Sequence, residues 1–381
     1  MKARTAWIER IEAAWRRKSI VWLPGVRRAG KTTLCQSLQG VEYFDCELPR
    51  VRRMIDDPEA FLEDMAGKRI VLDEVHRLDQ PAELLKIAAD HYPKIRIVAT
   101  GSSTLGASAR FRDTLAGRKA IIWLTPMTHS DQAAFGDRRW KRRLLHGGLP
   151  PFFLAEQPPE QDFHEWLDAY WAKDIQEMFR LEKRHSFLRF VELLLVSSGG
   201  IFEATRFARD CEVSRTTITN YLGVLEATFV AHVVRPFSSR RATEIIAAPK
   251  VYGFDTGFVA HYRGWSELRP EDHGNLWEHV VLNEMHALGQ TRDIRYWRDK
   301  QGHEVDFVLP GKASEPAAIE CKWKADGFDP ANMLLFRKGY PNGANLVVAS
   351  DVDKPFTRTH RGMRVRYVGI ADMSTAIHGA V

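Results

Sequence analysis

The sequence has little cysteine. Only four cysteines occur among 381 residues, and they lie far apart at Cys35, Cys46, Cys211 and Cys321. None has a second cysteine or a histidine at the spacing of a zinc site, and the pattern does not predict a disulfide framework. Because reduced, isolated thiols are typical of the cytoplasm, we expect a cytoplasmic protein.

Long apolar runs are also missing. The richest stretch, FVELLLV at 190–196, is far shorter than the roughly 20 residues that cross a bilayer. Near the N-terminus, the apolar residues between 7 and 15 recur at helical spacing with charges between them, which is not the pattern of an export signal. We therefore expect no membrane-spanning segment and no membrane partner.

The composition is that of a globular protein with more than one core. Hydrophobic residues make up 44% of the chain and charged residues 27%, and 381 residues exceed what one core usually organises. The proline pairs at 150–151 and 158–159 interrupt both helix and strand. We predict three domains, at residues 1–150, 151–265 and 266–381.

The net charge is positive. A formal charge of +6 and a pI of about 9.1 make nucleic acids plausible partners, because neutralising phosphates is the sequence-independent part of their binding. The basic residues gather in DRRWKRR at 137–143 and RPFSSRR at 235–241. Such runs are equally typical of a solvated surface, so the charge supports a nucleic-acid partner without establishing one.

A phosphate-binding loop follows the first predicted strand. SIVWLP at 19–24 is β-prone, GVRRAGKT at 25–32 has the GxxxxGK[ST] spacing, and TTLCQSL continues as a helix. In that arrangement the loop amides surround phosphates, Lys31 reaches the β- and γ-phosphates, and the Thr32 hydroxyl is a ligand of Mg²⁺. The candidate ATP contacts are Gly25, Arg28, Gly30, Lys31, Thr32 and Thr33.

A second apolar strand ends in two acids. In RIVLDEVHRL at 69–78, Asp73 is placed to hold the magnesium ion and Glu74 to polarise the attacking water. Taken alone, the segment could be a buried strand with exposed acids at its end. Behind a phosphate-binding loop, the pattern favours the second nucleotide motif of an ATPase.

Two further strands complete the predicted sheet. IRIVATGSS at 95–103 ends in small polar residues, of which Ser102 is the candidate sensor of the γ-phosphate, although a serine-rich turn is the alternative. KAIIWL at 119–124 is another strand. Helical stretches between the strands predict a parallel sheet covered on both faces.

The middle of the chain predicts helices. Trp166, Tyr170, Trp171, Ile175 and Phe179 recur at helical spacings that are typical of a helical core.

Residues 203–226 predict a helix-turn-helix. Ser214 is a suitable N-cap, and Ile218, Leu222 and Leu225 form one apolar stripe. The opposite face would meet DNA, with protein contact or a lid over the ATPase as the alternative role. The candidate DNA contacts are Arg215, Thr216, Thr219 and Asn220.

The C-terminal part carries an ordered set of charged residues. Glu278 lies early in a helix predicted to begin at Gly274, Asp306 follows the start of a strand, and Glu320 and Lys322 alternate with apolar residues in another strand. Because side chains alternate in a strand, Glu320 and Lys322 are predicted to share one face.

These motifs together resemble a known family. The sequence is similar to prokaryotic AAA-type P-loop ATPases that carry a winged-helix region and a C-terminal PD-(D/E)xK restriction-endonuclease-like domain. The segments that carry the resemblance are GVRRAGKTTL, VLDEVHRL, ATGSS, LAGRKAIIWLTPMT, GGLPPF, YWAKDI, PKVYGFDTG and the C-terminal set.

The resemblance implies roles for particular residues. Asp306, Glu320 and Glu278 would hold Mg²⁺ or Mn²⁺ at a phosphodiester, and Lys322 would be the cation beside the reacting groups. Val305 stands where the proline that names the superfamily would precede the aspartate. Arg118, in LAGR, is the candidate arginine that completes an ATP site, in its own chain or in a neighbouring copy.

The resulting expectation is an α/β protein with three parts: a P-loop parallel-sheet ATPase, a helical and winged-helix middle, and an α/β restriction-endonuclease-like end. Its work would be ATP-driven engagement or remodelling of DNA coupled to metal-dependent cleavage, with branched DNA as the substrate suggested by a similarity to archaeal Holliday junction resolvases. Two alternatives stay open: a regulatory switch driven by ATP with a silent nuclease fold, and a sequence-preferring DNA-binding regulator.

Overall fold

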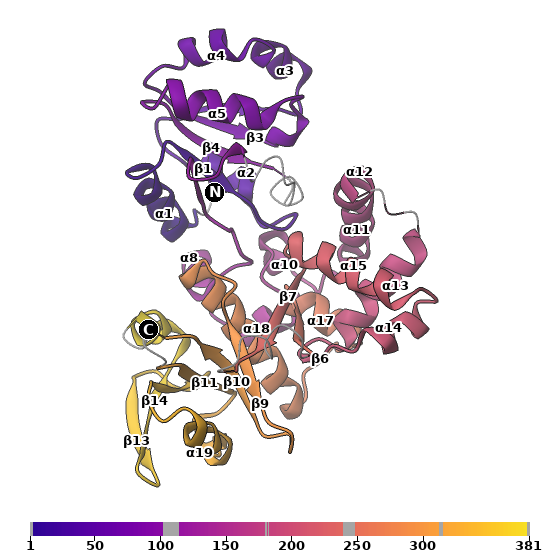
Figure 1. The fold of residues 1–381 in the computed structure, drawn as a ribbon, viewed down its shortest axis with the longest axis vertical. Helices are drawn as coiled ribbons and strands as arrows, with labels where there is room; N and C mark the ends of the chain where they lie inside the picture. The colour runs from indigo at the N-terminus through magenta and orange to yellow at the C-terminus, as the bar shows by residue number, and fades with distance from the viewer. Residues whose placement is uncertain are drawn as a thin grey trace. The chain divides into compact units, whose positions relative to one another are not determined.

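The computed structural model describes residues 3–101, 114–179, 181, 183–238, 248–311 and 315–378. By packing, the chain forms two compact units that interleave along the sequence (Figure 1). Unit 1 contains Met1–Arg138, Leu149–Arg184 and Gly223–Val230, and unit 2 contains Arg139–Gly148, His185–Leu222 and Ala231–Val381. This division by packing is a different criterion from the three domains predicted from the sequence, and those domains stay a prediction.

Unit 1 is built on a five-stranded sheet with the order β2-β3-β4-β1-β5, and the pairs between neighbouring strands are all parallel. Its strands are β1 (Ile20–Leu23), β2 (Glu42–Asp45), β3 (Arg69–Asp73), β4 (Arg96–Thr100) and β5 (Lys119–Ile121). Its helices are α1 (Thr5–Trp15), α2 (Lys31–Gln36), α3 (Pro49–Ile55), α4 (Pro58–Asp64), η1 (Val75–Arg77), α5 (Pro81–His91), α8 (His129–Phe135), α10 (Pro150–Leu154), α11 (Glu160–Tyr170), η2 (Trp171–Ile175) and α12 (Gln176–Phe179).

The predicted parallel sheet is confirmed, and β2 is the strand that sequence patterns missed. Each of the three inner strands β1, β3 and β4 contains a continuous buried apolar run, IVWL, IVL and IVA, as a sheet covered on both faces requires. Strand β2 reads EYFD, with only Phe44 buried, so it lacks the apolar run that marks the others. It lies at the edge of the sheet, where one strand neighbour suffices.

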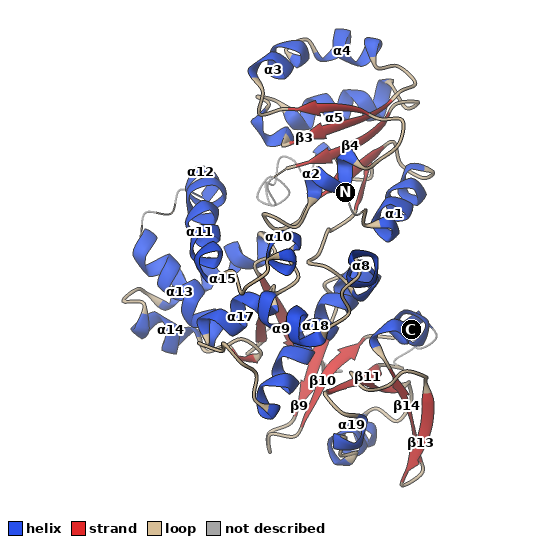
Figure 2. Ribbon diagram, turned by 180° about the vertical axis from the view of Figure 1, so that it is seen from behind, coloured by secondary structure: helices blue, strands red, loops and turns tan. Residues whose placement is uncertain are grey.

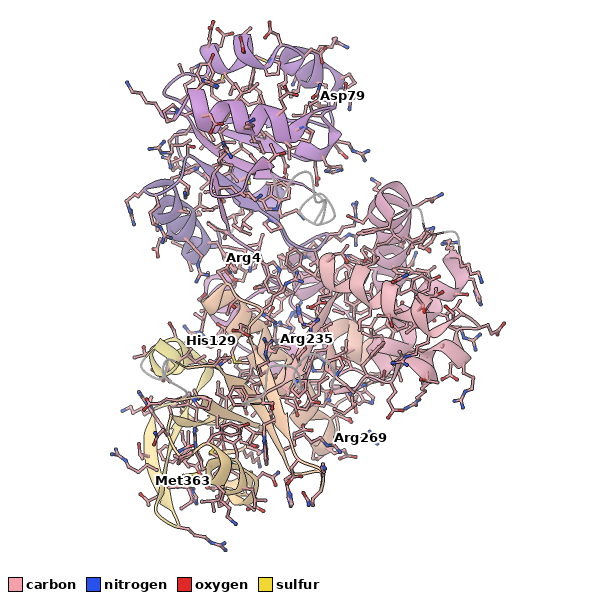
Figure 3. All side chains as sticks on the ribbon, viewed as in Figure 1. Arg4, Asp79, His129, Arg235, Arg269 and Met363 are labelled. Carbon is pink, nitrogen blue, oxygen red and sulfur yellow. The ribbon has the colours of Figure 1, made fainter. Side chains whose placement is uncertain are left out.

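A buried ion pair fastens α1 and α8 to the phosphate-binding loop. Arg4, which directly precedes α1 (Figure 3), is 4% exposed and its Nη2 lies 2.6 Å from Oδ2 of Asp131. The same arginine donates to the carbonyls of Ala29 and Thr125 at 3.0 and 3.1 Å. Asp131 also accepts from Thr128, the N-cap of α8. Residues far apart in sequence therefore fix the backbone of the loop.

Unit 2 is built on a nine-stranded mixed sheet with the order β13-β14-β12-β11-β10-β9-β7-β8-β6 (Figure 2). Its strands are β6 (Gly200–Ile201), β7 (Ala231–Pro236), β8 (Lys250–Gly253), β9 (Arg295–Arg298), β10 (Glu304–Leu309), β11 (Ala317–Lys322), β12 (Asn345–Ala349), β13 (Phe356–His360) and β14 (Met363–Val368). Its helices are α9 (Trp140–His146), α13 (Arg184–Val196), α14 (Ala204–Asp210), α15 (Arg215–Ala227), α17 (Thr256–Tyr262), α18 (Pro270–Gly289), η4 (Ala325–Gly327), α19 (Ala331–Gly339), η5 (Ile370–Asp372) and α20 (Met373–His378), with the first residue of α13 and the end of α15 assigned to unit 1.

The long helix α18 packs against β11, and α19 packs against β10. Helix α18 begins at Pro270, four residues before the predicted start at 274, so Glu278 lies in the middle of the helix and not early in it. Within the described part of the chain, no helix is long and apolar enough to cross a membrane.

Two helices, α14 and α15, occupy the segment for which a helix-turn-helix was predicted. Ser214 caps α15 by accepting from the backbone N–H of Thr217 at 3.0 Å. Ile218, Leu222 and Leu225 are buried, as the apolar stripe predicted. The candidate DNA contacts Arg215, Thr216, Thr219 and Asn220 are all exposed.

The basic run at 137–143 is only partly a surface feature. Arg143 is 1% exposed, and its Nη1 donates to Oγ1 of Thr256 at 2.7 Å and lies 4.0 Å from the Asp255 carboxylate. A buried, paired guanidinium is not available to phosphates, so Arg143 does not contribute to a polyanion-binding surface. In the second basic run, residues 239–241 lie outside the described residues.

We expect Asp131→Asn to weaken unit 1 around the phosphate-binding loop. Removing one member of a buried pair costs about 3 kcal/mol, which corresponds to a roughly 100-fold loss of protection of the α1 and α8 amides in hydrogen exchange. The neighbouring positive charge of Arg4, with hydrogen bonds from Arg4 and Thr128, lowers the pKa of Asp131 despite its burial. The pair therefore stabilises the fold above pH ~4, and the difference between the two proteins should vanish as the pH falls below that value.

The matched control is Asp90→Asn. Asp90 pairs with Arg118 in the same unit, but both side chains are about one-third exposed. An exposed pair contributes little, so this variant should leave protection unchanged. Equal protection in Asp131→Asn and the parent at pH 7 would contradict the proposed anchoring of the loop.

Candidate nucleotide site and carboxylate cluster

The turn after β1 has the backbone geometry of a loop that encloses an anion. Gly30 has a φ of 91°, in the left-handed region that favours glycine. At Gly25 a Cβ atom would lie 2.5 Å from the carbonyl oxygen of Leu124, so no larger residue fits. Both glycines of the motif are therefore required by the path of the chain.

Lys31 begins α2 and is directed back over the loop. Its Nζ donates to the carbonyls of Gly25 and Val26 at 2.9 and 3.2 Å, and its side chain is 9% exposed. Burial lowers the pKa of Lys31, and the charges of Glu74, Asp174 and Asp73 partly offset the decrease. The ammonium is held where a phosphate group placed in the loop would meet it.

Asp73 is a buried carboxylate at the end of β3 that is held by hydroxyl groups. Its Oδ2 accepts from Thr32 Oγ1 at 2.8 Å and from the Tyr43 hydroxyl, and its Oδ1 accepts from Thr100 Oγ1. The two side chains that the sequence predicted to share a magnesium ion, Thr32 and Asp73, are thus hydrogen-bonded to each other. Their oxygens form the donor set that Mg²⁺ prefers.

Glu74 follows with a φ of 53°, an uncommon conformation for a residue with a side chain. Its backbone N–H donates to Thr100 Oγ1 at 3.1 Å, and its Oε2 lies 3.2 Å from His76 Nδ1. Although burial acts to raise the pKa of Glu74, the hydrogen bond with His76 and the charge of Lys31 lower it below its ordinary value. The carboxylate is ionised at neutral pH and can accept a proton.

Lys31, Thr32 and Glu74 line a cavity of about 730 Å³ in unit 1, and Asp73 adjoins it through its hydrogen bond with Thr32. The cavity is also lined by residues from the segment after the sheet, including Pro150, Pro151, Leu154, Lys173 and Asp174. Asp174 lies in the π-helical turn η2, and its Oδ2 is 3.1 Å from Nε of Arg27 in the loop. The volume lies within the range of ligand sites, roughly 300–1,000 Å³.

Of the other predicted nucleotide contacts, two line the cavity and one lies outside the described residues. Thr33 and Arg28 line the cavity, and Arg28 pairs with Asp162 at 3.2 Å. Ser102, the predicted γ-phosphate sensor, lies outside the described residues.

Arg118 lies away from the cavity of its own chain. It immediately precedes β5, whose first residue pairs with the first residue of β1, whereas the loop follows the last residue of β1. In a parallel sheet these two positions lie at opposite ends of the strands. At the end away from the loop, Nε of Arg118 lies 2.7 Å from Oδ1 of Asp90. The cis form of the prediction is therefore wrong, and only a site in a neighbouring copy remains open to Arg118.

Sequence patterns missed four residues that shape the site: Arg4, Tyr43, Thr100 and Asp174. The strand that ends at Thr100 was predicted, but the sensor role was assigned to Ser102, two residues later. Trp166, Tyr170, Trp171 and Ile175 are buried as predicted for a helical core, and Phe179 is only partly buried. No local signal distinguished Asp174 from an exposed acid of that helix, because its contact with Arg27 spans 147 positions.

In unit 2, the four charged residues of the C-terminal pattern come together. The Nζ of Lys322 lies 2.7 Å from Glu320 and 3.7 Å from Asp306, so the predicted shared face of β11 is confirmed. Glu278 reaches the same cluster from α18 and accepts from the Tyr252 hydroxyl at 2.9 Å. Lys250 of β8, which was not predicted, lies 3.7 Å from Glu278.

Burial and mutual repulsion govern this carboxylate cluster. Burial and the charge of Asp306 raise the pKa of Glu278 to about 7 and that of Glu320 to about 8. Oε1 of Glu320 is buried without a hydrogen-bond partner. An unpaired buried carboxylate oxygen is costly, which indicates a proton or a cation at this position.

Among the described residues, no three histidine, cysteine or acidic side chains are arranged to hold a metal ion. The lysines explain this, because Lys322 occupies the other oxygen of Glu320. The donor set still fits a hard cation at Asp306 and Glu320, since both offer carboxylate oxygens and one of these has no partner.

Comparison with protein families identifies the first of these sites. Residues 17–132 match a family model described as an AAA domain. These residues form an AAA-type P-loop ATPase domain. Residues 137–269 and 273–367 match two further models, each described as a domain of unknown function (DUF8612 and DUF4143).

Similar proteins extend over most of the chain. An uncharacterized protein of Mycobacterium tuberculosis is 29% identical over 327 residues, which cover 82% of this chain and 72% of that protein. An uncharacterized protein of Haemophilus influenzae is 20% identical over 353 residues, covering 84% and 86%. Among solved structures, a Walker-type ATPase of Pyrococcus abyssi has a TM-score of 0.44 and 14% identity, covering 69% of this chain and 96% of that one.

We expect Asp174→Asn to tighten the binding of ATP by the ATPase domain. The substitution removes a negative charge from the cavity and releases Arg27, so a triphosphate should bind about fivefold more tightly, on the order of 1 kcal/mol. Titration with a fluorescent ATP analogue measures the effect. Asp168→Asn is the matched control, because it removes an exposed acid whose partner, Arg184, does not line the cavity, and it should leave binding unchanged. Weaker or unchanged binding in Asp174→Asn would count against a phosphate position beside Arg27.

Proposed function

We propose that this protein hydrolyses ATP in its AAA-type domain to engage or remodel DNA, and that unit 2 carries a metal-dependent nuclease site. The observation that carries the ATPase part is that Lys31, Thr32 and Glu74 line one cavity, with Asp73 hydrogen-bonded to Thr32. Thr32 and Asp73 would hold Mg²⁺, which would neutralise charge on the β- and γ-phosphates when it is bound.

The hydrolytic step follows from the positions of the charged groups. The oxygen of a water molecule bonds to the γ-phosphorus while the bond from that phosphorus to the β–γ bridging oxygen breaks, leaving ADP and phosphate. Glu74 takes the proton of the water, and its lowered pKa keeps the carboxylate ionised at neutral pH so that it can accept one. Lys31 stabilises charge on the phosphates. Arg118 of a neighbouring copy is the proposed additional cation, which would make the active form a homo-oligomer.

The nuclease part rests on the carboxylate cluster. Asp306 and Glu320 are proposed to hold Mg²⁺ or Mn²⁺, Glu278 is the additional candidate ligand, and Lys322 lies beside them as a cation for the phosphodiester. A water oxygen would attack the phosphorus as one ester oxygen leaves. Branched DNA is the proposed substrate, by the resemblance to junction resolvases.

The DNA-binding part rests on the order of elements around α15. Helix α13, strand β6, helices α14 and α15, and the antiparallel pair β7 and β8 follow one another as in a winged helix. The exposed residues Arg215, Thr216, Thr219 and Asn220 would lie on the helix that meets the DNA.

One observation favours a second candidate function. Because Lys322 binds Glu320 and no described group of three ligands is ready for a metal, the cluster is also compatible with a silent nuclease fold in an ATP-driven regulatory switch. That protein would hydrolyse ATP slowly, respond little to DNA and cut no DNA in Mg²⁺ or Mn²⁺.

The deciding experiment measures ATP hydrolysis and DNA cleavage together, on linear and branched substrates. We expect Lys31→Ala and Glu74→Gln to lower ATP turnover at least 100-fold, with Glu74→Gln still binding ATP, because it retains the loop but loses the proton acceptor. Lys322→Ala should keep ATP turnover and lose cleavage. Cleavage by Lys322→Ala at the parent's rate would refute the nuclease assignment, and full turnover by Glu74→Gln would refute the role of Glu74.

We expect Arg215→Glu to weaken DNA binding at moderate salt, because a charge that faces phosphates becomes repulsive. Fluorescence anisotropy with a labelled duplex measures the affinity, and the loss should be about 10-fold or more and should shrink as salt increases. Arg189→Glu is a suitable control, since this exposed arginine lies on α13 and pairs with Glu212. Equal affinity of Arg215→Glu and the parent would rule out DNA contact by α15.

A further inference from the structure

The carboxylate cluster of unit 2 contains a second lysine that is deeper than the first. Lys250 is 5% exposed, and its Nζ lies 2.6 Å from Oε1 of Glu304 and 3.7 Å from Oε2 of Glu278. It comes from β8, which is separated from β10 in the sheet by β9 and β7. Its ammonium therefore reaches the cluster from outside the C-terminal pattern.

The two lysines divide the cluster into two halves. Lys322 binds Glu320 and Asp306, whereas Lys250 binds Glu304 and Glu278. The two halves differ in whether every carboxylate oxygen has a partner. Glu278 also accepts from the Tyr252 hydroxyl, while Glu320 keeps one buried oxygen without a partner.

The lysines also differ in their freedom to move. The Lys322 side chain is 28% exposed and can turn toward solvent when a cation arrives. The Lys250 side chain is 6% exposed and its ammonium lies 5.5 Å from the centre of the Tyr252 ring. Separating a buried ammonium group from the two carboxylates that pair with it costs free energy. The half of the cluster around Lys250 is therefore already occupied by a positive charge.

The positions available for a second ion lead to the same result. A two-metal site would require a second ion about 3.5–4 Å from the first, with carboxylates between the two ions. In this cluster the Lys250 ammonium stands among those carboxylates.

We propose that the cluster binds one divalent cation, at Asp306 and Glu320, and that Lys250 takes the place of a second. This inference rests on the proposed metal-dependent site and specifies it as a one-ion site. Glu278 then serves to hold Lys250 and is not a direct ligand of the ion.

The test counts Mn²⁺ ions bound to the full-length, nucleotide-free protein, by electron paramagnetic resonance of the free ion. Mn²⁺ ions bound elsewhere in the protein are present in every variant. The difference in bound Mn²⁺ between the parent and Glu320→Gln therefore gives the number of ions at the cluster. We expect the parent and Lys250→Arg to bind one ion more than Glu320→Gln. Lys250→Met should bind two more, because removing the ammonium opens the second position.

Each result decides between the possibilities. Two ions lost from the parent on Glu320→Gln would overturn the one-ion site, even if Lys250→Met failed to fold. An unchanged count and affinity in Lys250→Met would overturn the role of Lys250. Equal counts in the parent and Glu320→Gln would instead mean that the proposed metal site itself is absent, which is a different outcome from either of these.

Discussion

The ATPase domain depends on one buried negative charge. Asp73 is 3% exposed, and its carboxylate accepts hydrogen bonds from hydroxyl groups on three segments: Thr32 after the loop, Tyr43 on β2 and Thr100 at the end of β4. Burying a carboxylate is costly unless its oxygens are satisfied. This requirement brings together the carboxyl ends of neighbouring strands, and the phosphate-binding loop takes its position from them.

The two units handle buried charge in different ways. In unit 1, hydroxyls and a loop lysine surround Asp73 and Glu74 and leave a cavity beside them. In unit 2, the acids outnumber the lysines that neutralise them, and burial raises the pKa of Glu278 and Glu320. A carboxylate whose pKa is raised by burial holds its proton more tightly, whereas Asp73 is fixed by hydroxyl donors from three segments.

The sequence patterns predicted those parts of the molecule that depend on local spacing. The loop from Gly25 to Thr32, the acids after β3 and the alternation of Glu320 and Lys322 all follow from turn, strand and helix periodicity. The contacts of Arg4, Asp174 and Lys250 were not predictable in this way. Each of these contacts joins residues separated by more than 50 positions in the sequence. A charged residue with such a distant partner lies in the same local sequence pattern as a charged residue that faces solvent.

The wide turn η2 affects the spacing of the helix in which it lies. A π-helical turn holds one residue more than an α-helical turn, so side chains after it are rotated by about 100° relative to those of a continuous α-helix. Trp166 and Tyr170 precede this insertion, and the partly buried Phe179 follows it. A natural relative or engineered variant that lacks one residue between 171 and 175 would therefore turn the residues that follow, Gln176–Phe179, toward a different face of the helix.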